Sequence, residues 1–130
     1  MPHNLTLKVI QDKFAVCKLP PDAPIPVELS QEVYFSITRA PDELSLVVPE
    51  SRVQPGWKVE TGWRMIKVLG PLEFSMVGVL LQIAEPLSRA HISIFVTSTY
   101  DTDYLMVKGS VLGSAVAALR ASGIEVSWGE

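Results

Sequence analysis

Carboxylates, hydroxyls and helix-start amides gather in two short stretches of this sequence. Residues 98–103 read Ser-Thr-Tyr-Asp-Thr-Asp, and residues 72–78, Leu-Glu-Phe-Ser-Met-Val-Gly, lead into an apolar helical pattern. An amino acid needs N–H donors for its carboxylate and acceptors for its ammonium group. The first amides of a helix supply such donors, and the carboxylates of Asp103, Asp101 and Glu73 supply the acceptors. These residue types are therefore compatible with binding of a small zwitterion.

The donors are expected in the first turn of the helix. Ser75 is an N-cap residue that directly precedes an apolar pattern over residues 76–89, so the N–H groups of Met76, Val77 and Gly78 are predicted to be unpaired. Gly78 would let a carboxylate approach closely because it has no Cβ.

Each of these residues also has a purely structural interpretation, which the sequence leaves open. Ser75 is an ordinary helix cap whatever else it does, and Glu73 suits the positive end of the helix. Asp101 and Thr102 are common turn residues whose side chains bond the nearby backbone. Asp103 opens a predicted strand, where Asp is disfavoured, so its carboxylate is either solvated or held by a partner.

Catalytic and metal-binding patterns are not found. The sequence has no glycine-rich phosphate loop, no G-x-S-x-G turn and no paired carboxylates beside a histidine, so we expect neither an enzyme nor a cofactor. His3 and His91 are isolated, which predicts no metal site. The single cysteine, Cys17, is expected to be a buried apolar residue, because no histidine stands ready to activate it.

The composition of the sequence argues against some classes of binding partner. The 130 residues are 48% hydrophobic and carry 11 basic and 14 acidic side chains, a net charge of −3. This length suits one domain or two very small halves, and the acidic balance argues against nucleic acid. The longest apolar run, residues 76–81, is far shorter than a membrane span, and the N-terminus lacks the pattern of a secretory signal. We therefore expect a cytoplasmic protein with no membrane partner.

The first half, residues 1–60, is predicted to be rich in strands. Alternation predicts strands over residues 5–9 and 14–19, joined by a polar hairpin turn at residues 11–13. Prolines at residues 20–26 must leave the sheet. A second hairpin turns at residues 40–42. Residues 49–62 are expected to be a surface connector, pinned by Trp57 and Trp63.

The second half, residues 61–130, is predicted to follow the order βαββαβ. Strands are expected over residues 65–69, 92–97, 104–107 and 124–128, with helices over residues 76–89 and from about residue 111 to a left-handed stop at Gly123. The expected buried stripe of the first helix is Val77, Leu80, Ala84 and Leu87; that of the second is Leu112, Ala115, Val116 and Leu119. This order is ferredoxin-like, an α+β class with an antiparallel sheet on one side and two helices on the other.

The segments 70–75, Gly-Pro-Leu-Glu-Phe-Ser, and 91–105, which contains Ser-Thr-Tyr-Asp-Thr-Asp-Tyr, resemble those of ACT domains. The resemblance covers residues 63–127 and is shared with arginine sensors of the CASTOR type and with the regulatory halves of aspartate kinases. It implies regulatory binding of an amino acid at an interface between paired ACT units, with Asp103 and residues 72–75 as carried-over site residues. The first half resembles a smaller, strand-rich ACT-like unit.

Two functions from different classes are consistent with these patterns. The first is an amino acid sensor whose ligand-binding residues are Leu72, Glu73, Phe74, Ser75, Met76, Val77, Gly78, Ser98, Thr99, Asp101 and Asp103. The sensors resembled here carry four ACT units in one chain, so a complete site in this chain is expected to require a homodimer. The alternative is a homo-oligomeric assembly domain with a vestigial ligand site, in which exposed sheet edges pair between chains.

Overall fold

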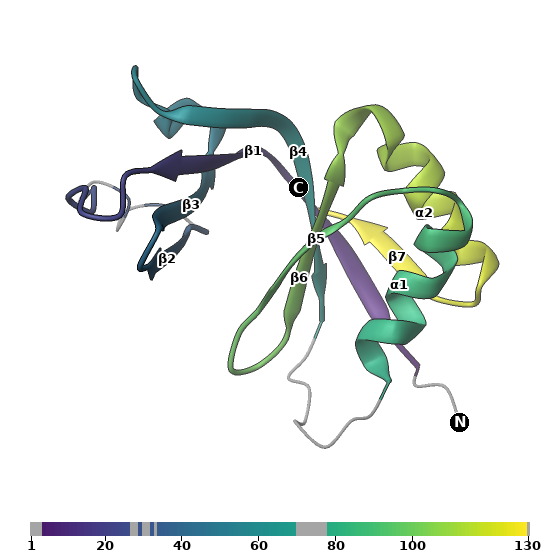
Figure 1. Ribbon diagram of the computed structural model, residues 1–130. Helices are drawn as coiled ribbons and strands as arrows, with labels where there is room; N and C mark the ends of the chain where they lie inside the picture. Colours follow the sequence, from purple (N-terminus) through teal and green to yellow (C-terminus); the bar gives the residue numbers. More distant parts are fainter. Residues whose placement is uncertain (1–3, 27–28, 30–31, 33, 70–77, 130) are drawn as a thin grey trace. The chain divides into compact units, whose positions relative to one another are not determined.

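The computed structural model describes residues 4–26, 29, 32, 34–69 and 78–129 (Figure 1). Its elements are β1 (Thr6–Leu19), β2 (Ser36–Ala40), β3 (Glu43–Pro49), a 3₁₀ turn (Glu50–Arg52), β4 (Lys58–Val68), α1 (Val79–Arg89), β5 (Phe95–Ser98), β6 (Asp103–Lys108), a 3₁₀ turn (Gly109–Val111), α2 (Leu112–Ala121) and β7 (Glu125–Trp128). From β4 onward the order is βαββαβ, so the predicted ferredoxin-like α+β class is confirmed.

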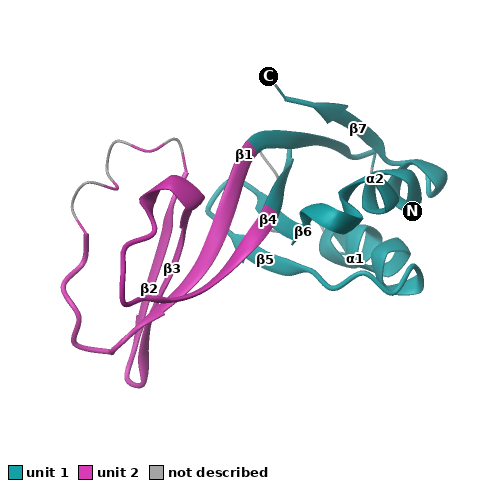
Figure 2. Cartoon of the chain, turned by 90° about the horizontal axis from the view of Figure 1, so that it is seen from above, with its two compact units in different colours: residues 1–11, 64–130 teal, residues 12–63 magenta. Residues whose placement is uncertain are grey.

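The chain forms two compact units, residues 1–11 with 64–130 (unit 1) and residues 12–63 (unit 2). Figure 2 shows β1 and β4 changing colour part of the way along, because each strand runs from one unit into the other. Contacts therefore group residues 1–11 with the second half of the chain. The division into domains at residue 60 stays a prediction.

Unit 1 is a sheet with both helices on one face. Its strands lie in the order β7, β1, β4, β6, β5, each bonded to the next, and Figure 1 shows α1 and α2 on the same side of this sheet. The core lies between the two layers and takes alternate residues of the strands, such as Leu7 and Val9 of β1, Ile66 of β4, and Leu105 and Val107 of β6. This alternation assigns each strand residue to the helix-covered face or to the opposite face.

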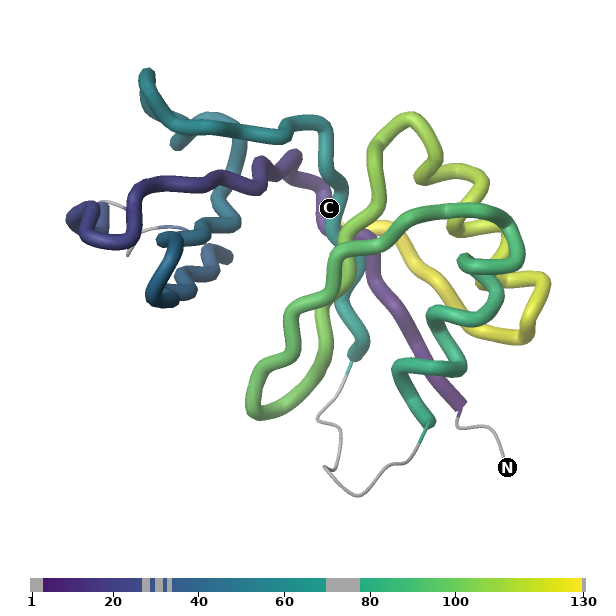
Figure 3. The backbone as a smooth tube through the Cα atoms, viewed as in Figure 1, coloured from purple at the N-terminus to yellow at the C-terminus, as the bar shows by residue number. Residues whose placement is uncertain are grey.

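One pairing in unit 1 differs from the expected antiparallel sheet. β7 pairs with β1 in parallel, with Thr6 opposite Glu125 and Val9 opposite Trp128. In Figure 3 the purple start of the chain and its yellow end run side by side. The N-terminal strand thus lies between β7 and β4, because Leu5, Leu7 and Val9 bury their side chains in the same core as Val126. Apolar alternation alone does not say which strand pairs with which.

The second helix follows its sequence pattern. Its buried residues are Leu112, Ala115, Val116 and Leu119, as predicted. Gly123 has a φ of 85°, and its N–H donates to the Arg120 carbonyl at 3.0 Å. The expected left-handed stop is therefore confirmed.

The first helix starts later than predicted. Its N-cap is Gly78, with a left-handed φ of 82°, and its first residue is Val79. The predicted cap, Ser75, lies outside the described residues. The buried face consists of Val79, Ile83, Pro86 and Leu87, whereas Leu80 is 39% exposed. The predicted stripe is confirmed at Leu87 and wrong at Leu80 and Ala84, while Val77 lies outside the described residues. Apart from Gln82, the run from residue 79 to 84 is apolar, so the sequence leaves the buried face of this part undetermined.

The predicted hairpin at residues 11–13 is also wrong. β1 continues through these residues as one strand of 14 residues. Gln11, Asp12 and Lys13 are exposed within it, and none of them is a glycine, proline or asparagine that would favour a tight turn. These residues are polar because they are exposed where β1 passes from unit 1 into unit 2.

Unit 2 contains the second hairpin and the end of β1. Ala40 pairs with Glu43, so the predicted turn after Ala40 is confirmed, and β3 pairs antiparallel with β1, with Cys17 opposite Leu46. A separate apolar cluster forms on one face from alternate strand residues: Ala15, Cys17, Leu19, Leu44, Leu46 and Val48, joined by Leu29. The prolines after Leu19 leave the sheet as expected.

The predicted connector is shorter than its range of residues 49–62. β4 begins at Lys58, and the Gly62 N–H donates to the Glu50 carboxylate at 2.6 Å. Trp57 packs against the apolar cluster of unit 2, and Trp63 is buried. Both tryptophans therefore anchor the chain, as predicted.

We expect His91→Gly to stabilise the protein. His91 follows α1 with a φ of 60°, the left-handed conformation that glycine adopts without a Cβ clash. Its N–H donates to Ser88, and the next N–H, of Ile92, donates to Leu87 at 2.9 Å, which holds His91 in place. The substitution should raise the free energy of unfolding by roughly 0.5–1 kcal/mol in urea denaturation. Ala90→Gly, one residue earlier at a φ of −86°, should lower it, and equal effects would contradict the argument.

Candidate functional site

The predicted ligand-binding stretch 98–103 forms the tip of the β5–β6 hairpin. Ser98 pairs with Asp103 across the two strands, and residues 99–102 form the loop between them. The Thr99 N–H donates to the Thr102 carbonyl at 2.8 Å, and the Thr99 hydroxyl donates to the same oxygen at 3.0 Å. Local hydrogen bonds therefore define the loop, and Thr99 is a turn-forming residue.

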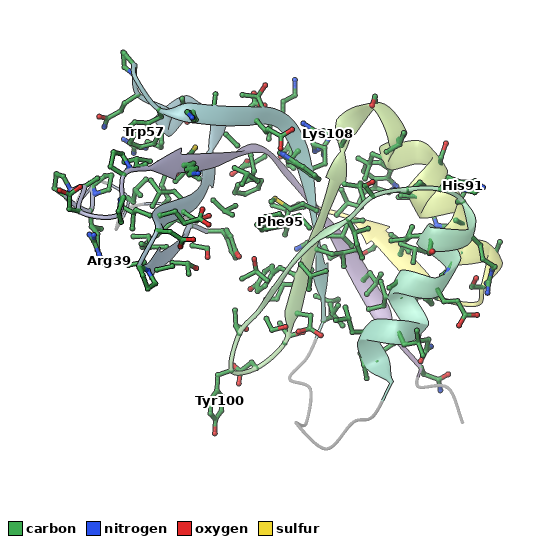
Figure 4. All side chains as sticks on the ribbon, viewed as in Figure 1. Arg39, Trp57, His91, Phe95, Tyr100 and Lys108 are labelled. Carbon is green, nitrogen blue, oxygen red and sulfur yellow. The ribbon has the colours of Figure 1, made fainter. Side chains whose placement is uncertain are left out.

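The side chains of the loop fall into two classes by exposure. Tyr100 is 82% exposed, and Figure 4 shows it pointing away from the body of unit 1 at the hairpin tip. Asp101 is exposed beside it. Thr102 is buried, and its hydroxyl donates to the Val68 carbonyl at the end of β4, at 2.5 Å. The predicted local bonding by Thr102 was therefore incomplete, because its hydroxyl bonds a strand 34 residues earlier.

Asp103 lies on the helix-covered face of the sheet. Leu105 and Val107 of the same strand pack in the core beneath the helices, and a period of two assigns Asp103 to their side. Ser98, opposite Asp103, shares this face with Val96, which also packs against the core. Asp103 is half-buried and is the first residue of β6. Its carboxylate therefore lies at the solvent-accessible end of the helix-covered face of the sheet.

Helix α1 begins at the same end of unit 1. The first hydrogen bond within the helix joins the Gln82 N–H to the Gly78 carbonyl at 2.8 Å. Among the described residues, the N–H groups of residues 78–81 therefore precede the bonds within the helix and are candidate donors. Of the donors predicted from the sequence, Gly78 is the N-cap, whereas Met76 and Val77 lie outside the described residues, so their role stays a prediction.

Six of the predicted site residues lie outside the described residues: Leu72, Glu73, Phe74, Ser75, Met76 and Val77. Of the others, the hairpin brings Ser98, Thr99, Asp101 and Asp103 together, and Gly78 stands at the start of α1. The end of β4, the hairpin tip and the start of α1 lie at one end of unit 1 (Figure 1). This end therefore carries backbone donors and a carboxylate acceptor on the same side of the sheet.

The sequence predicted Thr102 only as a turn residue, and its bond to another strand was missed. The available signal was a β-branched residue directly before the strand that Asp103 starts. A β-branched residue at the start of a strand packs well in a half-buried position. Sequence could not supply its partner, Val68, because that contact is tertiary.

Metal ligands, surface hollows and membrane-spanning helices were the other features sought among the described residues. They contain no group of three or more His, Cys, Asp or Glu side chains arranged to hold a metal ion. Two shallow hollows of about 150 and 210 Å³ lie in unit 2, and none of their lining residues belongs to the predicted site. Within the described part of the chain, no helix is both long and apolar enough to cross a membrane.

We expect the single thiol to be unreactive in the folded protein. Burial raises the pKa of Cys17 from 9.0 to about 11, because the thiolate would lose its hydration. At pH 8 a thiol reagent should therefore modify native Cys17 at least about 100-fold more slowly than the urea-unfolded chain. Because the unfolded thiol ionises first, the free energy of unfolding should also fall as the pH rises from about 9 towards 11. Equal native and unfolded rates would contradict burial of this thiol.

Comparisons with known proteins agree with the fold of unit 1. Residues 58–121 match the ACT domain family ACT_7, and residues 12–55 match the N-terminal domain of another family. The human protein named cytosolic arginine sensor for mTORC1 subunit 1 is 39% identical over 59 residues, which is 45% of this chain and 18% of the sensor. The match thus spans about a fifth of that relative's length.

Solved structures extend the likeness to nearly the whole chain. A protein from Agrobacterium tumefaciens is 31% identical, with a TM-score of 0.92 over 98% of this chain and 96% of that one. The regulatory subunit of aspartate kinase from Thermus thermophilus shares the fold at 11% identity, with a TM-score of 0.63 over 89% and 96% of the two chains. With its βαββαβ order and the match to the family model, the chain contains a member of the ACT domain family over residues 58–121.

Proposed function

We propose that this ACT protein is a regulatory sensor that binds an amino acid at the end of unit 1 described above. One observation carries the proposal: Asp103 lies on the helix-covered face of the sheet, at the end from which α1 begins. A bound amino acid would direct its ammonium group to Asp103 and its carboxylate to the N–H groups that start α1. The site residues predicted at positions 72–77 connect β4 to α1 and belong to the same proposal.

Similarity to known proteins supports this choice of ligand. The human relative is named as a cytosolic arginine sensor, and the Thermus protein is a regulatory subunit of an amino acid kinase. Arginine is therefore the first probe, and Asp101 or Glu73 would meet its guanidinium group. We infer a regulatory protein of the cytoplasm rather than an enzyme.

The test is a thermal-shift screen of the full chain against the twenty common amino acids at millimolar concentration, followed by calorimetric titration. A ligand at 100 times its Kd adds about 2.7 kcal/mol to the free energy of unfolding. For a chain of this size the expected rise in Tm is on the order of 10 °C. Stabilisation by one or a few amino acids supports the sensor. A flat response to all twenty overturns it.

A second function, homo-oligomeric assembly, is favoured by the edge of the unit 1 sheet. Among the described strands β5 pairs only with β6, and its residues, Phe95–Ser98, include no charged side chain and no proline to block pairing. A second copy would add its own β5 to this edge and form a dimer. Sedimentation of the protein with and without the amino acids separates the two functions, because a pure assembly domain forms the same dimer in both conditions.

A further inference from the structure

A buried hydroxyl joins the hairpin tip to the end of β4. Thr102 is 6% exposed and is the one buried polar residue among those that the structure describes. Its Oγ1 donates to the Val68 carbonyl at 2.5 Å. Its neighbours in the loop, Tyr100 and Asp101, are exposed. A hydroxyl buried in this way needs its hydrogen bond, because an unsatisfied one is costly.

Hydrogen bonds of Thr99 and Thr102 help to position the loop. Thr99 closes the loop on itself, since its hydroxyl accepts from the Thr102 N–H at 3.3 Å and donates to the Thr102 carbonyl. These bonds shape the loop but do not connect it to another strand. The bond from Thr102 to Val68 makes that connection, at the last residue of β4 and directly beside Asp103.

We propose that Thr102 is a positioning residue for the amino acid site. Its hydroxyl holds the hairpin tip against the end of β4 and thereby fixes where the Asp103 carboxylate stands relative to the start of α1. Thr102 itself does not contact the ligand. The inference rests on the proposed function, because it concerns the geometry of that same site.

The physical reason is preorganisation. A carboxylate on a loop held in one place is ordered before the ligand arrives, whereas a loop that pivots must be ordered during binding, and that cost lowers the affinity. In the variant Asp103 is still part of β6, which Leu105 and Val107 anchor in the core. Loss of the hydroxyl should therefore loosen the tip and leave the sheet folded.

The experiment compares Thr102→Val, which keeps the shape and removes the hydroxyl, with Thr102→Ser, which keeps the hydroxyl. Thr97→Val is the matched control, since Thr97 is a half-buried threonine of β5 in the same hairpin. The probe is the most strongly stabilising of the twenty common amino acids in the screen, titrated by calorimetry. We expect Thr102→Val to weaken binding about tenfold, with Thr102→Ser and Thr97→Val within threefold of wild type.

Hydrogen exchange tests the loosening of the loop, and its reversal on binding separates a positioning role from a purely structural one. In Thr102→Val the amides of residues 99–103 should exchange faster than in wild type without the probe, and reach wild-type protection when the probe saturates the protein. Wild-type affinity in a folded Thr102→Val variant overturns the inference and leaves the sensor intact. If the wild-type protein binds none of the twenty amino acids, both the proposed function and this inference are overturned.

Should Thr102→Val fail to fold, Thr102→Ser and Thr102→Ala form a second pair that differs by the hydroxyl group alone. Weaker binding by the alanine variant supports the positioning role. Equal affinity of the two overturns it.

Discussion

Asp103→Asn is expected to lower the affinity for the bound amino acid by roughly 10- to 100-fold. The carboxylate would accept a charge-assisted hydrogen bond from the ammonium group of the ligand, a contact worth about 1.5–3 kcal/mol. Asparagine keeps the size of the side chain and removes its charge. Because Asp103 is half-buried at the start of β6, the variant should keep its fold. Calorimetric titration with the amino acid found in the screen measures the loss.

Asp42→Asn is the matched control. Asp42 is exposed in the turn between β2 and β3 of unit 2, so the substitution makes the same charge change at a residue that the proposed site does not include. The control should bind within about threefold of wild type. Retained affinity in Asp103→Asn would remove this carboxylate from the site, and an equal loss in both variants would show that the effect is not specific to the site.

Leu105→Ala is expected to lower the free energy of unfolding by about 3–4 kcal/mol. Leu105 is fully buried on β6, within the cluster formed by the sheet and both helices of unit 1. Truncation removes its transfer free energy and leaves a cavity that the surrounding side chains fill only partly. Urea denaturation followed by circular dichroism measures the change, and the slope of the transition should stay near that of wild type.

Leu81→Ala provides the comparison for this loss. Leu81 is 64% exposed in the first turn of α1, so the same chemical change there should alter stability by less than about 0.5 kcal/mol. Similar losses in the two variants would mean that the core of unit 1 is not the one described above.

The local patterns of the sequence predicted several elements correctly. The buried stripe of α2 was visible because its apolar residues recur at helical spacing with small residues between them, and Gly123 marked the end of that helix. The β2–β3 hairpin was visible from the turn after Ala40. In each case the residues that determine the structure lie within a few positions of one another, so propensity and periodicity suffice.

Patterns that were locally ambiguous led to errors. The apolar run before Ile83 supports several helix faces, and the structure buries Val79 rather than Leu80. Polar residues 11–13 are compatible with a turn or with an exposed stretch of strand, and β1 passes straight through them. The ACT-like nature of residues 1–60 stays a prediction, as do the site residues at positions 72–77.

The sequence by itself determined the βαββαβ order of the second half and the residue types of the candidate site, because both depend on composition and short-range spacing. Only the tertiary structure decided that β1 enters the sheet between β4 and β7, and that Thr102 bonds the end of β4. Each of these contacts joins residues distant in sequence. Their partners are selected by the packing of a shared core and by the need to satisfy buried polar groups, and neither leaves a periodic signal along the chain.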